Sequence, residues 1–289
     1  MTKARENSDY TGLAADIVAG DTAARAGRKN LILNGGFDVW QRGTSFSPAG
    51  SGIYTADRWK FEGAGLTISR STEIPSGHLF KYSARIQNTA ASTSNNRTLI
   101  EDLDTILPNG VPWVLSAWIK VTSGGISIDC GDTAISGGFN SPSVWTKVSV
   151  TSSTRNASAT NGWIDIFLDA NTDAYITGVQ LELGSVATDF EHRSYGEELA
   201  LCQRYYYTTI YQKRQTSIAN GSYWHESLMF PTQMRTAPTC VWTTSAGNWF
   251  TVNGLYEYAD GNGVRIDFRT ASVSGSAYLY GSITADAEL

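Results

Sequence analysis

Three pairs of carboxylates are the first side chains in this sequence that could do chemistry. They are Asp165 with Asp169, Asp102 with Asp104, and Glu197 with Glu198. Glycoside hydrolysis needs two carboxyl groups that face each other across a cleft. On a strand, Asp165 and Asp169 would lie about 13 Å apart by the strand rise, and we expect Glu197 to cap a helix. The carboxylate pairs therefore favour a protein that is not an enzyme.

The histidines and cysteines do not form a metal-binding or nucleophilic pattern. The three histidines are far apart: His78, His192 and His225. None has a second His or Cys at the spacing of a zinc site. The three cysteines are also widely spaced: Cys130, Cys202 and Cys240. An odd number without a CxxC pair predicts reduced thiols. The sequence contains no G-x-S-x-G, G-x-G-x-x-G or Walker A motif, so we expect no nucleotide cofactor.

Composition excludes two classes of partner. The chain has 289 residues and a formal net charge of −5, and its Lys and Arg residues do not cluster. Nucleic-acid binding needs clustered cations, so we expect no nucleic-acid partner. No run of about 18 apolar residues could span a bilayer, and the opening residues MTKARENSD lack the apolar stretch of a secretory signal. We expect no membrane insertion and synthesis in the cytoplasm.

Short apolar runs separated by turn residues fill the chain from Asn30 to about Phe190. A period of two places Trp113, Leu115, Ala117, Ile119 and Val121 on one face of a strand, and Ser116, Trp118 and Lys120 on the other. In the same way Ile164, Ile166 and Leu168 face inward, while Trp163, Asp165 and Phe167 face outward. Many strands without a long amphipathic helix predict an antiparallel β-sandwich.

A helix is predicted to follow this region. Ser194 and Glu197 have the spacing of a capping box, which predicts a helix from Ser194 to about Arg204. The apolar surface of Leu199, Tyr205 and Tyr206 predicts that the helix docks between domains or against another chain. Residues 208–289 return to strand patterns, which predicts a smaller β-rich domain. The turn-rich segment from Gly247 to Gly263 is expected to be a loop at the tip of that domain.

Four segments carry a resemblance to known proteins. They are NLILNGGFDVWQRG (Asn30–Gly43), YTADRWK (Tyr54–Lys60), YITGVQLELGSVATDFEHRSYGEELALCQRYYY (Tyr175–Tyr207) and the closing ITADAEL (Ile283–Leu289). Together they resemble bacteriophage tail-fibre and related virion proteins, in the right order along most of the chain. The strand segments also resemble a carbohydrate-binding jelly roll. That resemblance implies core positions for Trp40, Trp59, Trp113 and Trp145.

The resemblance implies an architecture and a role. Residues 1–28 would be a virion-attachment segment, 29–190 a jelly roll like a carbohydrate-binding module, 191–207 a helical linker and 208–289 a β-rich tip. The protein would be a homotrimeric short tail fibre in the virion, made in the bacterial host cytoplasm. It would bind other tail or capsid proteins through residues 1–28 and a host surface glycan or receptor elsewhere. The alternative is a capsid or tail decoration or collar protein with a purely assembly role.

The resemblance also implies a weak candidate for a structural calcium site. Jelly-roll sugar-binding modules often hold one calcium ion with oxygen ligands between the first and last strands. Asn34 and Asp38 could contribute from the first strand. Thr177-Gly178 replaces the usual acidic pair of the last strand, which removes the expected carboxylates.

Outward-facing aromatic side chains are the candidates for glycan binding, because sugar rings stack their C–H faces on them. The first candidate set is Trp118, Lys120, Trp163, Asp165 and Phe167. The second set, in the C-terminal domain, is Trp249, Tyr256 and Tyr258. The alternative for both sets is burial against the second domain or another subunit.

Overall fold

The structure is a computed structural model of residues 1–289. It describes residues 28–47, 52–62, 65–89, 94–100, 112–130, 137–140, 143–152, 162–215, 221–248, 250–258, 260–270 and 277–288. The chain divides into two compact units, residues 1–198 and 199–289. The predicted attachment segment therefore lies almost wholly outside the described residues.

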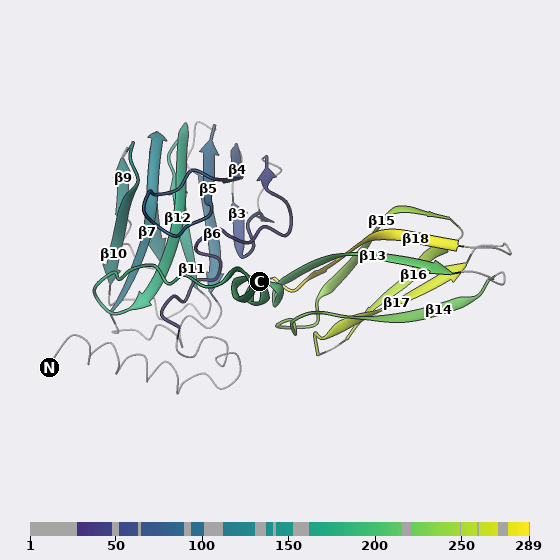
Figure 1. Ribbon diagram of the computed structural model, residues 1–289. Coiled ribbons are helices and arrows are strands. Elements are labelled where there is room, and N and C mark those ends of the chain that lie inside the picture. The colour runs from purple at the N-terminus through teal and green to yellow at the C-terminus, as the bar shows by residue number, and fades with distance from the viewer. Residues whose placement is uncertain are drawn as a thin grey trace. The chain divides into compact units, whose positions relative to one another are not determined.

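The larger unit is a β-sandwich of two antiparallel six-stranded sheets (Figure 1). Sheet A has the order β1 (Ser45–Phe46), β4 (Leu66–Ser71), β5 (Ser83–Asn88), β12 (Thr172–Leu183), β7 (Trp113–Ser123) and β10 (Thr146–Ser152). Sheet B has the order β2 (Ile53–Tyr54), β3 (Trp59–Glu62), β6 (Ser94–Ile100), β11 (Gly162–Leu168), β8 (Gly125–Cys130) and β9 (Gly137–Asn140). Consecutive strands pass from one sheet to the other several times, as in a jelly roll, which confirms the predicted fold class.

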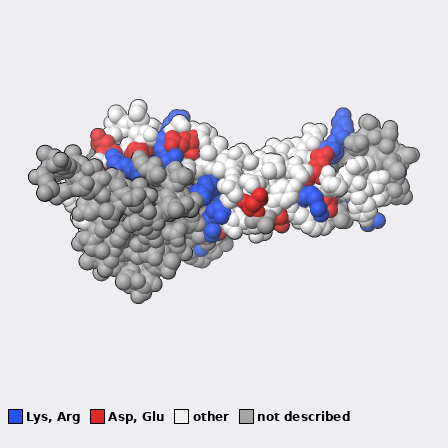
Figure 2. Space-filling view, turned by 90° about the horizontal axis from the view of Figure 1, so that it is seen from below, with Lys and Arg blue, Asp and Glu red and all other residues white. Residues whose placement is uncertain are grey.

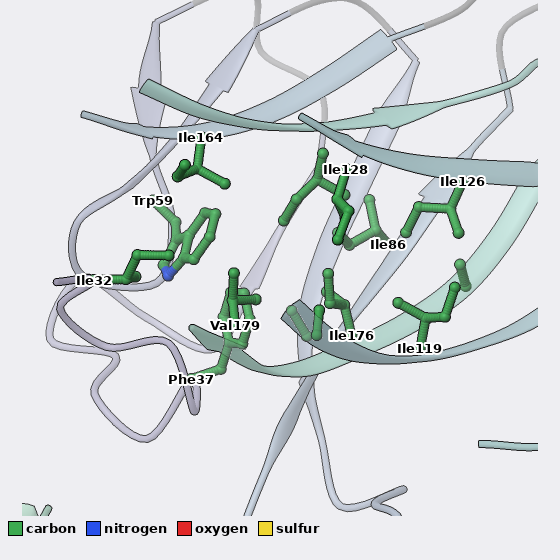
Figure 3. Packing of buried hydrophobic residues seen from close by; sticks show 14 of the residues in the cluster. Ile32, Phe37, Trp59, Ile86, Ile119, Ile126, Ile128, Ile164, Ile176 and Val179 are labelled. Carbon is green, nitrogen blue, oxygen red and sulfur yellow. The ribbon is translucent and has the colours of Figure 1, made fainter. Parts of the chain in front are cut away.

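The core of this unit lies between the two sheets and follows the period-two pattern. Trp113, Leu115, Ala117, Ile119 and Val121 of β7 are all buried, as are Ile164, Ile166 and Leu168 of β11. Figure 3 shows side chains of both sheets pointing toward one another, among them Ile119 from sheet A and Ile128 from sheet B. Because successive side chains alternate between faces, the buried residues also identify which neighbours lie on the outer faces.

A bulge interrupts β12 where it pairs with β7. The register shifts between Thr177 and Gln180, and Gly178 adopts a φ of 63°. A Cβ atom at Gly178 would lie 2.6 Å from the ring of Phe80. Glycine is therefore required at this position for both its backbone conformation and its lack of a side chain.

The helix α3 spans Tyr195–Gln203, close to the predicted range. The Ser194 hydroxyl accepts a hydrogen bond from the Glu197 amide at 3.3 Å, as expected of a helix N-cap. The Glu197 carboxylate pairs with Arg28 at 2.8 Å. Within the described residues, no helix has the length and apolar character needed to cross a membrane.

The smaller unit contains two antiparallel three-stranded sheets (Figure 1). Sheet C has the order β13 (Tyr206–Gln215), β18 (Ala277–Asp286) and β15 (Thr239–Asn248). Sheet D has the order β14 (Tyr223–Met229), β17 (Gly263–Thr270) and β16 (Phe250–Glu257). Both sheets contribute to one core that includes Val264, Ile266 and Phe268 of β17 and Leu279 and Ile283 of β18.

Candidate functional site

The structure separates the first set of predicted glycan-binding residues. Trp118 and Lys120 lie on the outer face of sheet A, because their neighbours Ala117, Ile119 and Val121 are in the core. Phe167 alternates with buried residues of β11, so it lies on the outer face of sheet B. The two groups therefore occupy opposite faces of the sandwich. They therefore cannot belong to one site. Alternation along a strand shows which side chains point outward and not which sheet the strand joins.

Two members of that set on β11 are less exposed than expected. Asp165 is only 2% exposed, so it is not a solvent-facing carboxylate. Phe167 is half-buried. Trp163 belongs to β11, but its side chain lies outside the described residues. Asp165 and Phe167 therefore expose less surface to a ligand than the sequence predicts.

Tyr175 lies at the centre of an aromatic and charged surface on the outer face of sheet A. It pairs in register with Arg85 of β5 on one side and Lys120 of β7 on the other. The Arg85 guanidinium carbon lies 5.5 Å from the centre of the Tyr175 ring, and the Lys120 Nζ lies 5.8 Å from it. Cations at these distances interact favourably with an aromatic ring and hold its orientation.

Trp145 is a third aromatic residue on this face, with Trp118 and Tyr175. The prediction that it belongs to the core is wrong. It is half-buried, and its ring meets that of Tyr175 edge-on with 6.4 Å between centroids. It precedes β10, in which Val148 and Val150 are buried. Trp145 is an odd number of residues from both, so alternation along β10 points it outward.

Two ion pairs surround Tyr175. Arg85 donates to both carboxylate oxygens of Asp173, from Nε at 3.0 Å and from Nη2 at 2.7 Å, and these bonds raise the pKa of Arg85. The Lys120 Nζ donates to the Glu73 carboxylate at 2.9 Å, which lowers the pKa of Glu73. Figure 2 shows acidic and basic side chains similarly interspersed on the described surface that it presents. The polar groups of this face thus have defined positions and can exchange hydrogen bonds with hydroxyl groups.

The connection from β4 to β5, residues 72–82, lies across part of this face and partly covers Trp118. The His78 ring lies 4.4 Å from that of Trp118. The Phe80 ring packs beside Phe190 and His192, with centroids 5.2 Å and 4.9 Å away. Burial, with a smaller contribution from His78, lowers the pKa of His192. Residues 72–82 therefore set how much of Trp118 a ligand can reach.

Asn34 is a structural residue and is not available as a calcium ligand. Its amide nitrogen donates to the carbonyl oxygens of Val39 and Asp57, each at 2.9 Å, and its amide oxygen accepts the Val39 N–H at 3.0 Å. Burial raises the pKa of Asp38. Within the described ranges, no three or more His, Cys, Asp or Glu residues are grouped to hold a metal ion.

The three predicted interface residues are largely covered. Tyr205 is fully buried and Tyr206 is 9% exposed within the single chain, while Leu199 is half-buried. The backbone of Tyr205 also bonds to Cys202 and Ala287. Little of either tyrosine ring is therefore left for a second copy.

Of the second glycan-binding set, the structure places Tyr256 on a strand and not on a loop. Tyr256 belongs to β16 and Tyr258 follows it directly, while Trp249 lies outside the described residues. Within the segment expected to be a loop, the register of β16 shifts between Val252 and Gly254. A bulge and a turn both favour glycine, so the sequence could not distinguish them.

Sequence reasoning missed most of the residues around Tyr175. The missed residues are Glu73, His78, Arg85, Asp173 and Tyr175. Arg85 and Tyr175 alternate with apolar residues in SARIQ and YITGV, so their outward direction could have been read. Their proximity could not, because it depends on the strand order β5-β12-β7.

Comparisons with known proteins find similar solved structures but no related sequence. No protein-family model matches the sequence, and a search of curated proteins finds no significant relative. Among solved structures, one similar chain is the enzymatically active domain of tailspike protein 4 of bacteriophage CBA120. That match has 18% identity and a TM-score of 0.36, and it covers 44% of this chain but 19% of the tailspike chain.

Two further similar structures are a family 61 carbohydrate-binding module in complex with β-1,4-galactotriose and the CBM22-1–GH10 modules of a Clostridium thermocellum xylanase with xylohexaose. The first has 13% identity and a TM-score of 0.35, and the match covers 54% of this chain and 100% of that one. The second has 14% identity and a TM-score of 0.36, and the match covers 54% of this chain and 29% of the xylanase chain.

Proposed function

We propose that this chain is a non-enzymatic virion protein of the tail-fibre type that binds a glycan on the outer face of sheet A. The observation that carries the proposal is the surface around Tyr175. There Trp118, Trp145 and Tyr175 offer ring faces for stacking. Arg85 with Asp173 and Lys120 with Glu73 supply donors and acceptors for hydroxyl groups.

The position of this surface supports the proposal. Sheet A is six strands wide, and Tyr175 lies on β12, which has neighbours on both sides. A broad face with half-buried aromatic rings suits an extended saccharide, whose successive sugar rings can each contact a different part of it. Half-buried rings also lose little conformational freedom on binding.

The sequence resemblance extends the proposal to the virion. A homotrimer in the phage tail, assembled in the bacterial cytoplasm and attached through residues 1–28, would present three copies of this face. Several weak contacts made at once would give tight attachment to a host glycan without breaking any bond.

A glycan array followed by titration tests the binding face. Tyr175→Ala should weaken binding to the best glycan about tenfold or more, since it removes the central ring. Phe167→Ala is the matched control, because it removes an aromatic ring from the outer face of sheet B. Loss of affinity in the control alone would move the site to sheet B. Absence of binding to any glycan at millimolar concentration would reject the proposed adhesion function.

The mass of the purified protein in solution tests the fibre assembly. One chain has a mass of 31.3 kDa, so a homotrimer would be about three times as heavy. Light scattering coupled to size-exclusion chromatography measures this directly. A stable monomer at micromolar concentration would be inconsistent with a self-assembled trimer.

A further inference from the structure

The outer face of sheet D in the smaller unit carries charged and aromatic side chains. Val264, Ile266 and Phe268 of β17 point into the core. Arg265, Asp267 and Arg269 alternate with them and therefore point outward. Strand register places Tyr223 of β14 opposite Arg269, His225 of β14 opposite Asp267, and Tyr256 of β16 opposite Arg265.

Two arginines on this face stack on two exposed tyrosines. The guanidinium carbon of Arg265 lies 4.5 Å from the centre of the Tyr256 ring, and that of Arg269 lies 5.4 Å from the centre of the Tyr223 ring. Tyr256 is 48% exposed and Tyr223 is 61% exposed. Stacking restrains each guanidinium, so its planar set of donors has a preferred direction before any ligand arrives.

The charges on the face favour an anionic ligand. Strand β17 contributes two guanidiniums to this face, those of Arg265 and Arg269, and one carboxylate, that of Asp267. Arg265 donates to Asp267 from Nε at 3.0 Å and from Nη2 at 3.4 Å, which uses two of its five N–H donors. The protein as a whole has a net charge of −5, so a locally cationic face attracts an anion that the rest of the surface would repel.

We propose that this face is a second saccharide site and that its ligand is a sugar carrying a carboxylate, such as a uronic or sialic acid. The sugar ring lies against Tyr256 or Tyr223, and its carboxylate accepts hydrogen bonds from the stacked arginines. A guanidinium can donate two parallel hydrogen bonds to one carboxylate. A neutral sugar has no carboxylate and cannot accept such a pair. A sheet face that combines exposed rings with cations fits such a sugar better than an acidic peptide, because the exposed rings offer faces on which a sugar ring can stack.

This proposal goes beyond glycan binding by sheet A, because it concerns the other unit and a charged class of sugar. The experiment must keep the two sites apart. Titrations are therefore made in a Tyr175→Ala background, which removes the central ring of the first site. The probes are trigalacturonate, a hyaluronate tetrasaccharide and sialyllactose, each beside a neutral counterpart of equal length.

A double variant tests the two arginines, and a variant on the other sheet serves as its control. Arg265→Met with Arg269→Met removes both guanidiniums and should weaken binding of the best carboxylated probe about tenfold or more. Arg214→Met is the matched control, because Arg214 is exposed and pairs with Tyr278 on the outer face of sheet C. The control should change the affinity less than about twofold, since an exposed charge on another face contributes little. Unchanged circular dichroism and melting temperature establish that each variant is folded.

Several results would overturn the proposal. Neutral sugars that bind as tightly as the charged ones would show that the carboxylate is not recognised. Equal losses in the Arg214 control would indicate a general charge effect. A poly-glutamate peptide of matched charge that binds as tightly as the sugars would point to charge recognition alone. Failure of every carboxylated probe at millimolar concentration would reject this site, whatever the result for sheet A.

Discussion

Asn34 shows how one polar side chain can organise a buried turn. Its backbone has a φ of 55°, a conformation that asparagine tolerates better than most residues. Its amide group joins the backbone of Val39 to that of Asp57, and its own carbonyl oxygen accepts the Trp59 indole N–H at 3.1 Å. The Asn34-Gly35 pair therefore stabilises the start of the sandwich rather than binding a ligand.

We expect Asn34→Ala to destabilise the larger unit by about 2–4 kcal/mol, because it leaves three buried backbone groups without their partner. Urea denaturation measures the free energy of unfolding. Addition of calcium or of EDTA should leave the melting temperature of the wild-type protein unchanged. A calcium-dependent rise in that temperature would restore the idea of a metal site.

Gly178 and Gly77 separate two costs of replacing glycine. Both have positive φ angles, 63° and 78°, so Ala at either position pays a backbone cost of about 1 kcal/mol. A Cβ atom at Gly77 would have no neighbour within 4 Å, whereas at Gly178 it would meet Phe80. Gly178→Ala should therefore be the more destabilising by about 1–3 kcal/mol in urea denaturation. Equal losses would mean that the Phe80 ring moves aside freely.

At the scale of elements, the connection between β4 and β5 controls the candidate binding face. Its Glu73 bonds to Lys120, its His78 lies on Trp118, and its Phe80 fills the space beside Gly178. Gly178, at the bulge in β12, leaves room for the Phe80 ring because it has no side chain. A strand irregularity thus positions a loop, and the loop in turn limits the exposure of a ring.

His192 should titrate abnormally. His192 should titrate below its ordinary pKa of about 6.5, chiefly because of burial. His78→Asn should raise the pKa of His192 but leave it below the ordinary value, because it removes only the charge repulsion. Proton NMR of the imidazole resonances measures the pKa of His192 in the wild-type protein and in the variant.

The lowered pKa of His192 also determines how the stability of the larger unit changes with pH. The unfolded chain binds more protons than the native one near the ordinary pKa, so the larger unit should lose stability as the pH falls below about 6.5. A His192 pKa at or above the ordinary value would contradict this account, as would a melting temperature of the larger unit that rises on acidification through this range.

At the scale of the whole molecule, the chain has two separate hydrophobic cores. One lies between sheets A and B and the other between sheets C and D. Each core draws its residues from its own unit, and the division falls within α3. We therefore expect each unit to respond to substitutions and to ligands in its own core.

Scanning calorimetry should accordingly show two unfolding transitions. Gly178→Ala should lower one melting temperature and leave the other within about a degree, because distant, independent sites do not couple. A glycan that binds sheet A should raise only the transition that Gly178→Ala lowers. A single transition that shifts as a whole in the variant would show that the units unfold together.

The sequence alone determined the elements and their buried faces, because side-chain periodicity and capping are local. It predicted the inward residues of β7 and β11, the helix after Ser194, and the outward direction of Trp118 and Lys120. The strand order was decided only by the tertiary structure. Pairing between β5 and β12 places Tyr175 beside Arg85. Phe167 lies on the opposite face because β11 belongs to sheet B. The side-chain amide of Asn34 bonds to backbone groups of Val39 and Asp57. A binding face depends on which strands become neighbours, and no spacing along one strand contains that information.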